Sequence, residues 1–290
     1  MNKRAAVLGG HTGLLGIPLV KSLRSACFEV KPLGRADFDV LDPKALGEFL
    51  DDYKPNWVFN TVAYTAVDKA EDHPDEAAKL NKTLPGMLAR LCAMRGAGLV
   101  HYSTDFVFDG TKATPYTEED GVNPTGVYGR SKLDGEREIM ASGLDRWLIL
   151  RTAWLFGSAK SNFVHKIIGL AQSREELSVV HDQLGSPTYT PDLADYSLAL
   201  LKAKATGLFH VVNGGRASWC ELAAEALTAA GLKCRIRPIT TAEYPLKATR
   251  PPYSVLDTGK FTKATGVSPR PWLQALRDYV YRDLGAGGED

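Results

Sequence analysis

The sequence predicts an α/β fold: a Rossmann-type doubly wound parallel sheet with a smaller C-terminal α/β substrate-binding lobe. Short, nearly continuous apolar runs alternate with helical patterns through the first half of the 290 residues, as in a parallel sheet covered on both faces. A glycine-rich turn follows the first apolar run. After about residue 155 the strand and helix signals shorten and mix, which indicates a second unit.

The chain is about twice as long as a typical domain. We expect a dinucleotide-binding domain over residues 1–155 plus about 186–213. The substrate-binding lobe then takes about 156–185 plus 214–290.

Four apolar runs predict strands of the first unit, in addition to a strand that begins at Phe28: RAAVLGG from Arg4, NWVFNTVA from Asn56, GLVHYSTDFVF from Gly98 and RWLILRTAWLFG from Arg146. Between the first two runs, DPKALGEFLDDY predicts a helix. Asp42 is its N-cap and Pro43 is its first residue. In the second half, ASWCELAAEALTAAG predicts a helix that ends at Gly231, and another helix begins near Thr190.

Charge and cysteine content exclude several classes of protein. The 35 basic and 34 acidic side chains leave a net charge of +1, so no basic excess indicates nucleic-acid binding. No apolar stretch approaches the roughly 18 residues of a membrane span, and the amino-terminal apolar run ends at once in glycines, unlike a signal peptide. The four cysteines form no C-x-x-C pair, which argues against a disulfide framework and structural zinc. We therefore expect a cytoplasmic protein with no nucleic-acid or membrane partner.

The stretch GHTGLLG follows the first predicted strand and opens a helical pattern, with glycines spaced three apart. Free backbone N–H groups and the helix dipole make such a place an anion site, and glycine lets a pyrophosphate approach the backbone. The spacing differs from the G-x-G-x-x-G fingerprint, but the position at the first strand favours a nucleotide site over a simple tight turn. We expect the cofactor to contact Gly10, His11, Thr12, Gly13, Leu14, Leu15 and Gly16.

Arg35 comes shortly after the second predicted strand, FEVKPLG. A guanidinium there suits a ribose 2′-phosphate, whereas NAD sites usually place an acidic residue on the ribose hydroxyls. This favours NADPH, with NADH as a second accepted cofactor and a solvated surface arginine as the alternative. Asp39 and Val40 fall where an adenine edge could be read.

Tyr128 and Lys132 in VYGRSK stand four residues apart, so a helix places them on one face. An ammonium beside a phenol can lower the phenol pKa from about 10, although such a pair can also occur by chance. Ligands of doubly wound folds bind beyond the carboxyl ends of the strands, where Ser103 and Thr104 end one predicted strand. A phenol, an ammonium and hydroxyl groups together suit hydride transfer to a ketone, which needs a proton for the developing alkoxide.

These motifs, with LRTAWLFG, VVHDQLGSPTYTPDLA and TRPPYSVLDTGKF, resemble the extended short-chain dehydrogenase/reductase superfamily. Within it they are similar to the dTDP-4-dehydrorhamnose reductase family, and the resemblance covers nearly the whole chain. It implies NADPH-dependent reduction of the C4 ketone of dTDP-4-dehydro-L-rhamnose to dTDP-L-rhamnose, a nucleotide sugar for cell-surface polysaccharide.

The resemblance also implies roles for particular residues. Thr104, Tyr128 and Lys132 form the catalytic set, in which Tyr128 protonates O4 while Lys132 lowers the pKa of Tyr128 and holds the nicotinamide ribose. A second set binds cofactor or substrate: Ala63 and Tyr64 line the cofactor, Thr104, Asp105 and Trp154 face the sugar, and Arg250 meets the nucleotide diphosphate. Trp154 could instead be a core aromatic, and Arg250 could be solvated.

One departure concerns metal and assembly. Some members of this family are dimers bridged by a metal that glutamates hold, one of them just before the last glycine of the phosphate loop. This chain has Leu15 there, and Pro191 follows Thr190 at another such place. An apolar residue cannot ligate Mg²⁺. We therefore expect no metal and favour a monomer, with a homodimer as the alternative.

Two other functions remain open. The first is another nucleotide-sugar 4-ketoreductase, for example one that makes a 6-deoxytalose, and no residue distinguishes its product configuration. The second is a non-catalytic regulatory subunit that binds NADP and a partner enzyme. The presence of Thr104, Tyr128 and Lys132 argues against it.

Overall fold

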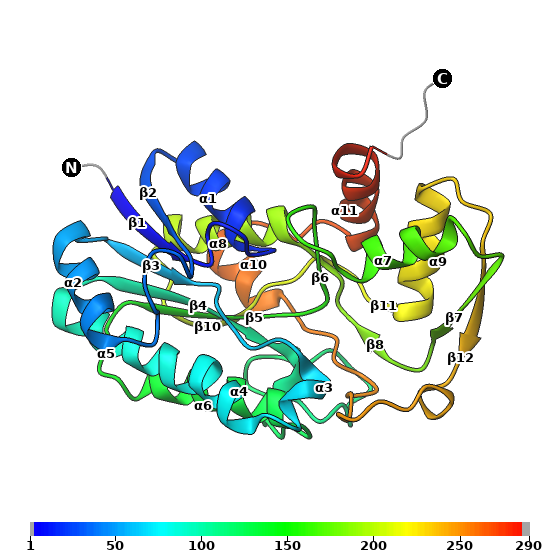
Figure 1. Ribbon diagram of the computed structural model, residues 1–290, viewed down its shortest axis with the longest axis horizontal. Coiled ribbons are helices and arrows are strands. Elements are labelled where there is room, and N and C mark those ends of the chain that lie inside the picture. The colour runs from blue at the N-terminus through cyan, green and yellow to red at the C-terminus, as the bar shows by residue number, and fades with distance from the viewer. Residues whose placement is uncertain (1–2, 286–290) are drawn as a thin grey trace.

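A six-stranded parallel sheet forms the centre of the protein in the computed structural model, which describes residues 3–285 (Figure 1). The strands lie in the order β2-β1-β3-β4-β5-β10, and every neighbouring pair is parallel. The sheet consists of β1 (Lys3–Leu8), β2 (Phe28–Leu33), β3 (Trp57–Asn60), β4 (Gly98–Thr104), β5 (Trp147–Thr152) and β10 (Gly207–His210). The predicted doubly wound sheet is confirmed.

Helices cover both faces of this sheet (Figure 1). Alternate residues of β1 point to opposite faces: Ala5 and Val7 join one core, and Ala6 and Leu8 join the other. The first core lies under α1 (Gly16–Ser25), α8 (Thr190–Lys202) and α10 (Gly259–Thr265). The second lies under α2 (Pro43–Tyr53), α5 (Leu84–Arg95) and α6 (Val127–Met140).

Local sequence signals set the ends of several helices. The Asp42 carboxylate caps α2 by accepting hydrogen bonds from the N–H groups of Lys44 and Ala45 at 2.8 and 3.3 Å, as predicted. Ahead of α5, the chain forms α3 (Val67–Ala70), α4 (Pro74–Ala78) and a π-helical segment (Lys79–Thr83). Short 3-10 turns follow β4 (Asp105–Val107) and β12 (Thr241–Glu243).

A smaller lobe lies beside the sheet (Figure 1). It has its own apolar core, which includes Phe156, Leu177, Leu222 and Tyr279. Its helices are α7 (Phe163–Ala171), α9 (Trp219–Ala229) and α11 (Trp272–Asp278), the last followed by a π-helical segment (Tyr279–Asp283). Its strands pair as β7 (Glu176–Val180) with β12 (Arg235–Ile239), β8 (Leu184–Gly185) with β11 (Ala217–Ser218), and β6 (Leu155–Phe156) with β9 (Thr188–Tyr189).

The apolar run RWLILRTAWLFG is two strands rather than one. β5 ends at Thr152 and β6 begins at Leu155, because the backbone of Trp154 turns into the left-handed region with φ +49°. This turn lets the chain leave the main sheet and pair with β9. Trp154 therefore lies where the chain passes from one part of the molecule to the other.

The C-terminal part of the chain returns to the main sheet. Phe261 of α10 joins the core under α8, where its ring centroid lies 5.3 Å from that of Tyr196. The division into domains stays a prediction. Within residues 3–285, every helix is too short or too polar to span a lipid bilayer.

Candidate active site

A cavity of about 2300 Å³ lies beyond the carboxyl ends of the parallel strands and reaches into the smaller lobe. Gly9 follows β1, and Thr61 follows β3, so the cavity opens at the point where the strand order reverses. Ligands of open α/β sheets bind at such a point. From the smaller lobe, Lys166, Gln183 and Trp219 complete the wall.

The glycines of the phosphate loop have two kinds of role. Gly9 adopts φ +82° and lines the cavity, and its carbonyl accepts a hydrogen bond from the Gly13 N–H at 2.9 Å. A Cβ at Gly16 would lie 2.1 Å from this carbonyl oxygen, and one at Gly10 would lie 2.8 Å from Pro32. Gly10 and Gly16 are therefore needed for close packing and do not line the cavity, whereas His11, Thr12, Gly13, Leu14 and Leu15 do. The sequence prediction missed Gly9, although it was visible as the first glycine of the pair after β1.

Arg35, Asp39 and Val40 all line the cavity. Arg35 is exposed and forms no ion pair with any part of the chain that the structure describes. Asp37 was not predicted: its carboxylate accepts a hydrogen bond from the Gly34 N–H at 2.7 Å and lies 3.3 Å from Nε2 of His11. At the end of the cavity near β2, the Arg35 guanidinium therefore lacks an ion-pair partner within residues 3–285, whereas the Asp37 carboxylate already has hydrogen-bond and ion-pair partners.

The structure places Ala63 on the cavity wall but not Tyr64. The backbone N–H and C=O of Tyr64 both bind the side-chain amide of Asn81, at 2.9 and 3.0 Å. The same amide donates to Ser131 of α6 at 3.0 Å. Asn81 therefore ties the loop after β3 to the helix that carries Tyr128.

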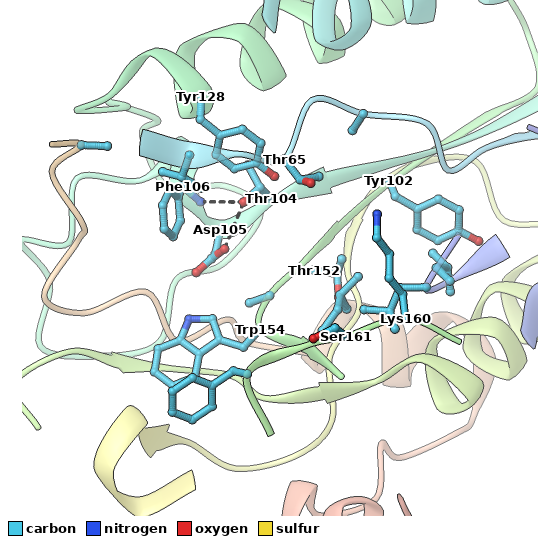
Figure 2. A pocket seen from close by; sticks show the side chains of 18 of the residues that line it. Thr65, Tyr102, Thr104, Asp105, Phe106, Tyr128, Thr152, Trp154, Lys160 and Ser161 are labelled. Carbon is cyan, nitrogen blue, oxygen red and sulfur yellow. Dashed lines mark hydrogen bonds between the residues drawn. The ribbon is translucent and has the colours of Figure 1, made fainter. Parts of the chain in front are cut away.

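Tyr128, Thr104 and Asp105 meet in the cavity (Figure 2). Thr104 Oγ1 donates to Oδ1 of Asp105 at 3.1 Å and accepts from the Phe106 N–H at 3.2 Å. Burial raises the pKa of Tyr128 to about 12, although its hydrogen bond with Thr104 acts the other way. Tyr128 is thus a protonated donor at neutral pH.

Lys132 lies on the same helix face as Tyr128, and its Nζ contacts residues of β4. Nζ donates to the Tyr102 carbonyl oxygen at 2.5 Å and lies 3.1 Å from Nε2 of His101. Burial lowers the pKa of Lys132 to about 8, against the opposite effect of the Glu136 carboxylate. The pKa of Tyr128 is raised overall because burial dominates it, and the expected lowering effect of Lys132 on this pKa stays a prediction.

A buried ion pair between Glu136 and Arg151 joins the elements that carry the site residues. Both carboxylate oxygens of Glu136 accept hydrogen bonds from Arg151, at 3.0 and 2.7 Å, and Ser103 also donates to Glu136. Glu136 and Arg151 are almost wholly buried. They link α6, β4 and β5 where these elements carry Lys132, Thr104 and Thr152. The sequence prediction did not include this pair, since nothing local indicates that the two charges meet.

Trp154 lines the cavity across from Tyr128, with Asp105 between them (Figure 2). Its indole stacks on that of Trp219, with ring centroids 3.6 Å apart and planes 6° from parallel. Nε1 of Trp219 donates to Gln183 at 3.1 Å. The prediction that Trp154 faces the sugar stays a prediction, and Trp219 is a neighbour that sequence reasoning missed.

Arg250 lines the cavity but already has a partner. Its Nη1 and Nη2 donate to the two carboxylate oxygens of Asp68, at 2.6 and 2.5 Å. This pairing lowers the pKa of Asp68 to about 2. Contact of Arg250 with a diphosphate stays a prediction, and it would require the guanidinium to share its donors with Asp68.

Thr152 is the clearest unpredicted polar group in the cavity (Figure 2). It ends β5 opposite Thr104 of β4. Its hydroxyl is buried and has no hydrogen-bond partner within residues 3–285. Buried polar groups usually have a hydrogen-bond partner. We therefore expect a bound ligand to supply a polar group to this hydroxyl. Near Leu15, as in the rest of residues 3–285, no three His, Cys, Asp or Glu side chains are placed to hold a metal.

Comparison with known proteins adds to this geometry. The chain is 40% identical over 287 residues to the dTDP-4-dehydrorhamnose reductase of Streptomyces griseus, covering 96% of this chain and 94% of the relative. It is 40% identical to a probable dTDP-4,6-dihydroxy-2-methyloxan-3-one 4-ketoreductase of Streptomyces antibioticus, covering 94% and 93% of the two chains. A dTDP-4-dehydrorhamnose reductase of Bacillus anthracis, solved in complex with NADP, superposes with a TM-score of 0.93 at 32% identity, covering 96% and 99%.

The family model described as the RmlD substrate binding domain matches residues 4–284. This match takes in both the phosphate loop at β1 and the segment TRPPYSVLDTGKF from Thr249. The chain belongs to the RmlD substrate-binding family.

Proposed function

We propose that the protein reduces the C4 ketone of dTDP-4-dehydro-L-rhamnose with NADPH and forms dTDP-L-rhamnose. The Tyr128 hydroxyl carries this proposal: it stands protonated beside Thr104 and Asp105, in the cavity that begins at the phosphate loop. The names of the Streptomyces griseus and Bacillus anthracis relatives support the same reaction.

The residues present fit a dinucleotide. Gly9 and Gly13 bring bare backbone to the cavity wall. Within residues 3–285 the Arg35 guanidinium has no ion pair, so it can bind a 2′-phosphate, and the buried Thr152 hydroxyl has no hydrogen-bond partner, so it can bind a polar group. NADPH bound there supplies a hydride. NADH would leave the Arg35 guanidinium without the 2′-phosphate.

The side chains of the chain then handle the proton. As negative charge develops on O4 of the sugar, Tyr128 donates its phenolic proton to that oxygen. Thr104 can turn its hydroxyl from Asp105 toward the same oxygen and stabilise the charge. Lys132, one helical turn from Tyr128 on α6, stabilises the resulting phenolate and holds the cofactor ribose. Asp105 and Trp154 orient the sugar ring.

The test follows NADPH absorbance when the purified protein meets dTDP-4-dehydro-L-rhamnose, with the product identified by NMR. Tyr128→Phe should reduce kcat by about 100- to 10,000-fold, the usual share of general acid catalysis, while NADPH affinity stays within about twofold. The matched control is Tyr281→Phe, which removes a hydroxyl from an exposed ring in the π-helical segment after α11. Unchanged turnover of Tyr128→Phe would contradict the mechanism.

A second candidate keeps the site and changes the sugar. The Streptomyces antibioticus relative, named as a different 4-ketoreductase, is as similar to the chain as the Streptomyces griseus relative. A talose product, or turnover only with another keto-sugar, would favour this candidate. NADPH binding without turnover of any keto-sugar, together with a stoichiometric protein partner, would favour the regulatory subunit.

We also propose a metal-free monomer that acts in the cytoplasm. Leu15, an apolar residue that cannot ligate Mg²⁺, supports the first two points, and four free cysteines support the third. Sedimentation with and without Mg²⁺ tests the assembly. A magnesium-dependent dimer would contradict it.

A further inference from the structure

His101 is a fully buried residue of β4 that the proposed mechanism does not use. Its Nε2 lies 3.1 Å from Nζ of Lys132, and its Nδ1 lies 3.1 Å from Nδ2 of Asn60. Asn60 and His101 are register partners in β3 and β4. The three side chains therefore form a line behind the cavity wall, from β3 through β4 to α6.

The hydrogen bonds of Asn60 fix the order of donors along this line. Oδ1 of Asn60 accepts from the Val62 N–H at 3.1 Å, so the amide NH₂ group faces the imidazole. An NH₂ group only donates, which makes Nδ1 of His101 the acceptor. The proton of the neutral ring is then on Nε2 and faces Lys132. A hydrogen bond from Nε2 requires a lone pair on Nζ, which only the uncharged amine has.

A charged Lys132 requires the opposite arrangement. Its ammonium has three donors and no acceptor, so Nε2 must accept and the ring proton must move to Nδ1. The Asn60 amide must then turn Oδ1 toward the ring and release the Val62 N–H. The charge of Lys132, the tautomer of His101 and the orientation of Asn60 are thus linked.

The surroundings keep the ring neutral in both arrangements. Burial, and then the charge of Lys132, hold the pKa of His101 well below its usual value. Burial also lowers the pKa of Lys132 to about 8. Glu136 of the same helix favours the ammonium, and its carboxylate is itself paired with Arg151 of β5.

We propose that His101, oriented by Asn60, is the positioning residue for Lys132: it holds Nζ against the Tyr102 carbonyl and changes tautomer with the charge of the amine. The consequence for turnover rests on the proposed function, because it assumes that Lys132 serves the reaction. The tautomer change does not depend on that assumption.

The first experiment is ¹⁵N NMR of histidine-labelled wild-type protein without ligand, with the His101 signals identified by their loss in His101→Gln. As the pH falls through about 8, the ring proton should move from Nε2 to Nδ1 while the ring stays neutral. His210 is the internal control: its Nδ1 faces the Tyr116 carbonyl at 3.0 Å, which fixes the proton on Nδ1. A His101 tautomer that does not change over this range, or a cationic ring, would overturn the proposal.

The second experiment compares two variants by their kinetics at neutral pH. His101→Gln can place an amide atom near the position of Nε2, whereas the shorter side chain of His101→Asn reaches only the position of Nδ1. We expect kcat/KM to fall about tenfold or more in His101→Asn and to stay within about threefold of wild type in His101→Gln, because only the latter keeps a side-chain partner for Lys132 at the position of Nε2. If both variants kept the kcat/KM of wild type, or if both lost it to the same extent, the positioning role would be overturned.

The two proposals can fail separately. An inactive wild-type protein would end the proposed function and leave the NMR result to decide on His101. An active wild-type protein with a static tautomer would end only the present inference. If His101→Asn does not fold, the NMR measurement on the wild-type protein still decides.

Discussion

The Ser254 hydroxyl donates a hydrogen bond to Oδ2 of Asp105 at 2.6 Å, although the two residues are 149 positions apart in the chain. Thr104 donates a hydrogen bond to the other carboxylate oxygen, Oδ1. The Ser254 backbone N–H donates to the Leu184 carbonyl at 2.8 Å. Asp105 therefore joins the end of β4 to the segment after Arg250, and its own charge is buried in the process.

Asp105→Asn should change how stability depends on pH. Burial raises the pKa of Asp105 from 3.8 to about 6, so between these values the folded state holds a proton that the unfolded state has lost. The free energy of unfolding of the wild type thus decreases as the pH rises through this window, by up to about 3 kcal/mol for two pKa units. The asparagine cannot ionise and escapes this loss.

The measurement is urea unfolding of both proteins at pH 4 and pH 8. We expect the stability of Asp105→Asn relative to wild type to improve by about 1–3 kcal/mol from pH 4 to pH 8. Asp145→Asn, at an exposed position, is the control. A pH-independent difference for Asp105→Asn would show that this carboxyl is not a proton-linked group.

Arg35→Ala should separate the two nicotinamide cofactors. Arg35 lines the cavity next to Asp39 and is free of ion pairs in the described part of the chain. Loss of a charge-assisted hydrogen bond costs about 1.5–3 kcal/mol, so the Kd for NADPH should rise roughly 10- to 150-fold while that for NADH changes little. Fluorescence titration measures both, with the exposed Lys31→Ala as control. An equal loss for both cofactors would remove Arg35 from the 2′-phosphate site.

Trp219→Leu should weaken sugar binding more than cofactor binding. Without the stacked partner at 3.6 Å, the Trp154 indole loses an aromatic pair worth about 0.5–1.5 kcal/mol. We expect KM for the keto-sugar to rise roughly 2- to 13-fold with an unchanged Kd for NADPH, and Trp219→Phe to lie between the two. Trp272→Phe, at a tryptophan outside the cavity, is the control. A KM equal to that of wild type would show that Trp154 needs no support from Trp219.

His210→Asn should reduce the sensitivity of the protein to acid. Burial lowers the pKa of His210 from 6.5 to about 3, so between these values the unfolded state binds a proton that the folded state does not. Stability should thus decrease as the pH falls, by about 1.4 kcal/mol per pH unit from this group. Asparagine can still donate to the Tyr116 carbonyl but does not titrate. Unfolding between pH 6 and pH 4 should show a shallower slope for the variant, and an unchanged slope would contradict the assignment.

The sequence predicted what depends on neighbouring residues. Asp42 caps α2 because the N–H groups that it accepts from lie two and three residues away. Tyr128 and Lys132 share a helix because their spacing matches the helical period. The strands of the sheet and the phosphate loop followed in the same way from local runs and glycines.

What the sequence could not predict depends on residues far apart in the chain. The pairing of Arg250 with Asp68 spans 182 positions, and Trp154 meets Trp219 only because the chain turns at Trp154 and leaves the main sheet. The upward shift in the pKa of Tyr128 could not be predicted for the same reason: the burial of the ring depends on the whole cavity, while its spacing from Lys132 is local.

Ser103, Glu136 and Arg151 constrain how this chain can be varied. Removal of one partner from a buried ion pair leaves an uncompensated charge, at about 3–5 kcal/mol. In a library that randomises single positions, almost every substitution of Glu136 or Arg151 should therefore destabilise the protein. Replacement of both charges together by apolar residues of similar volume should preserve stability. We therefore expect the two positions to change together in evolution.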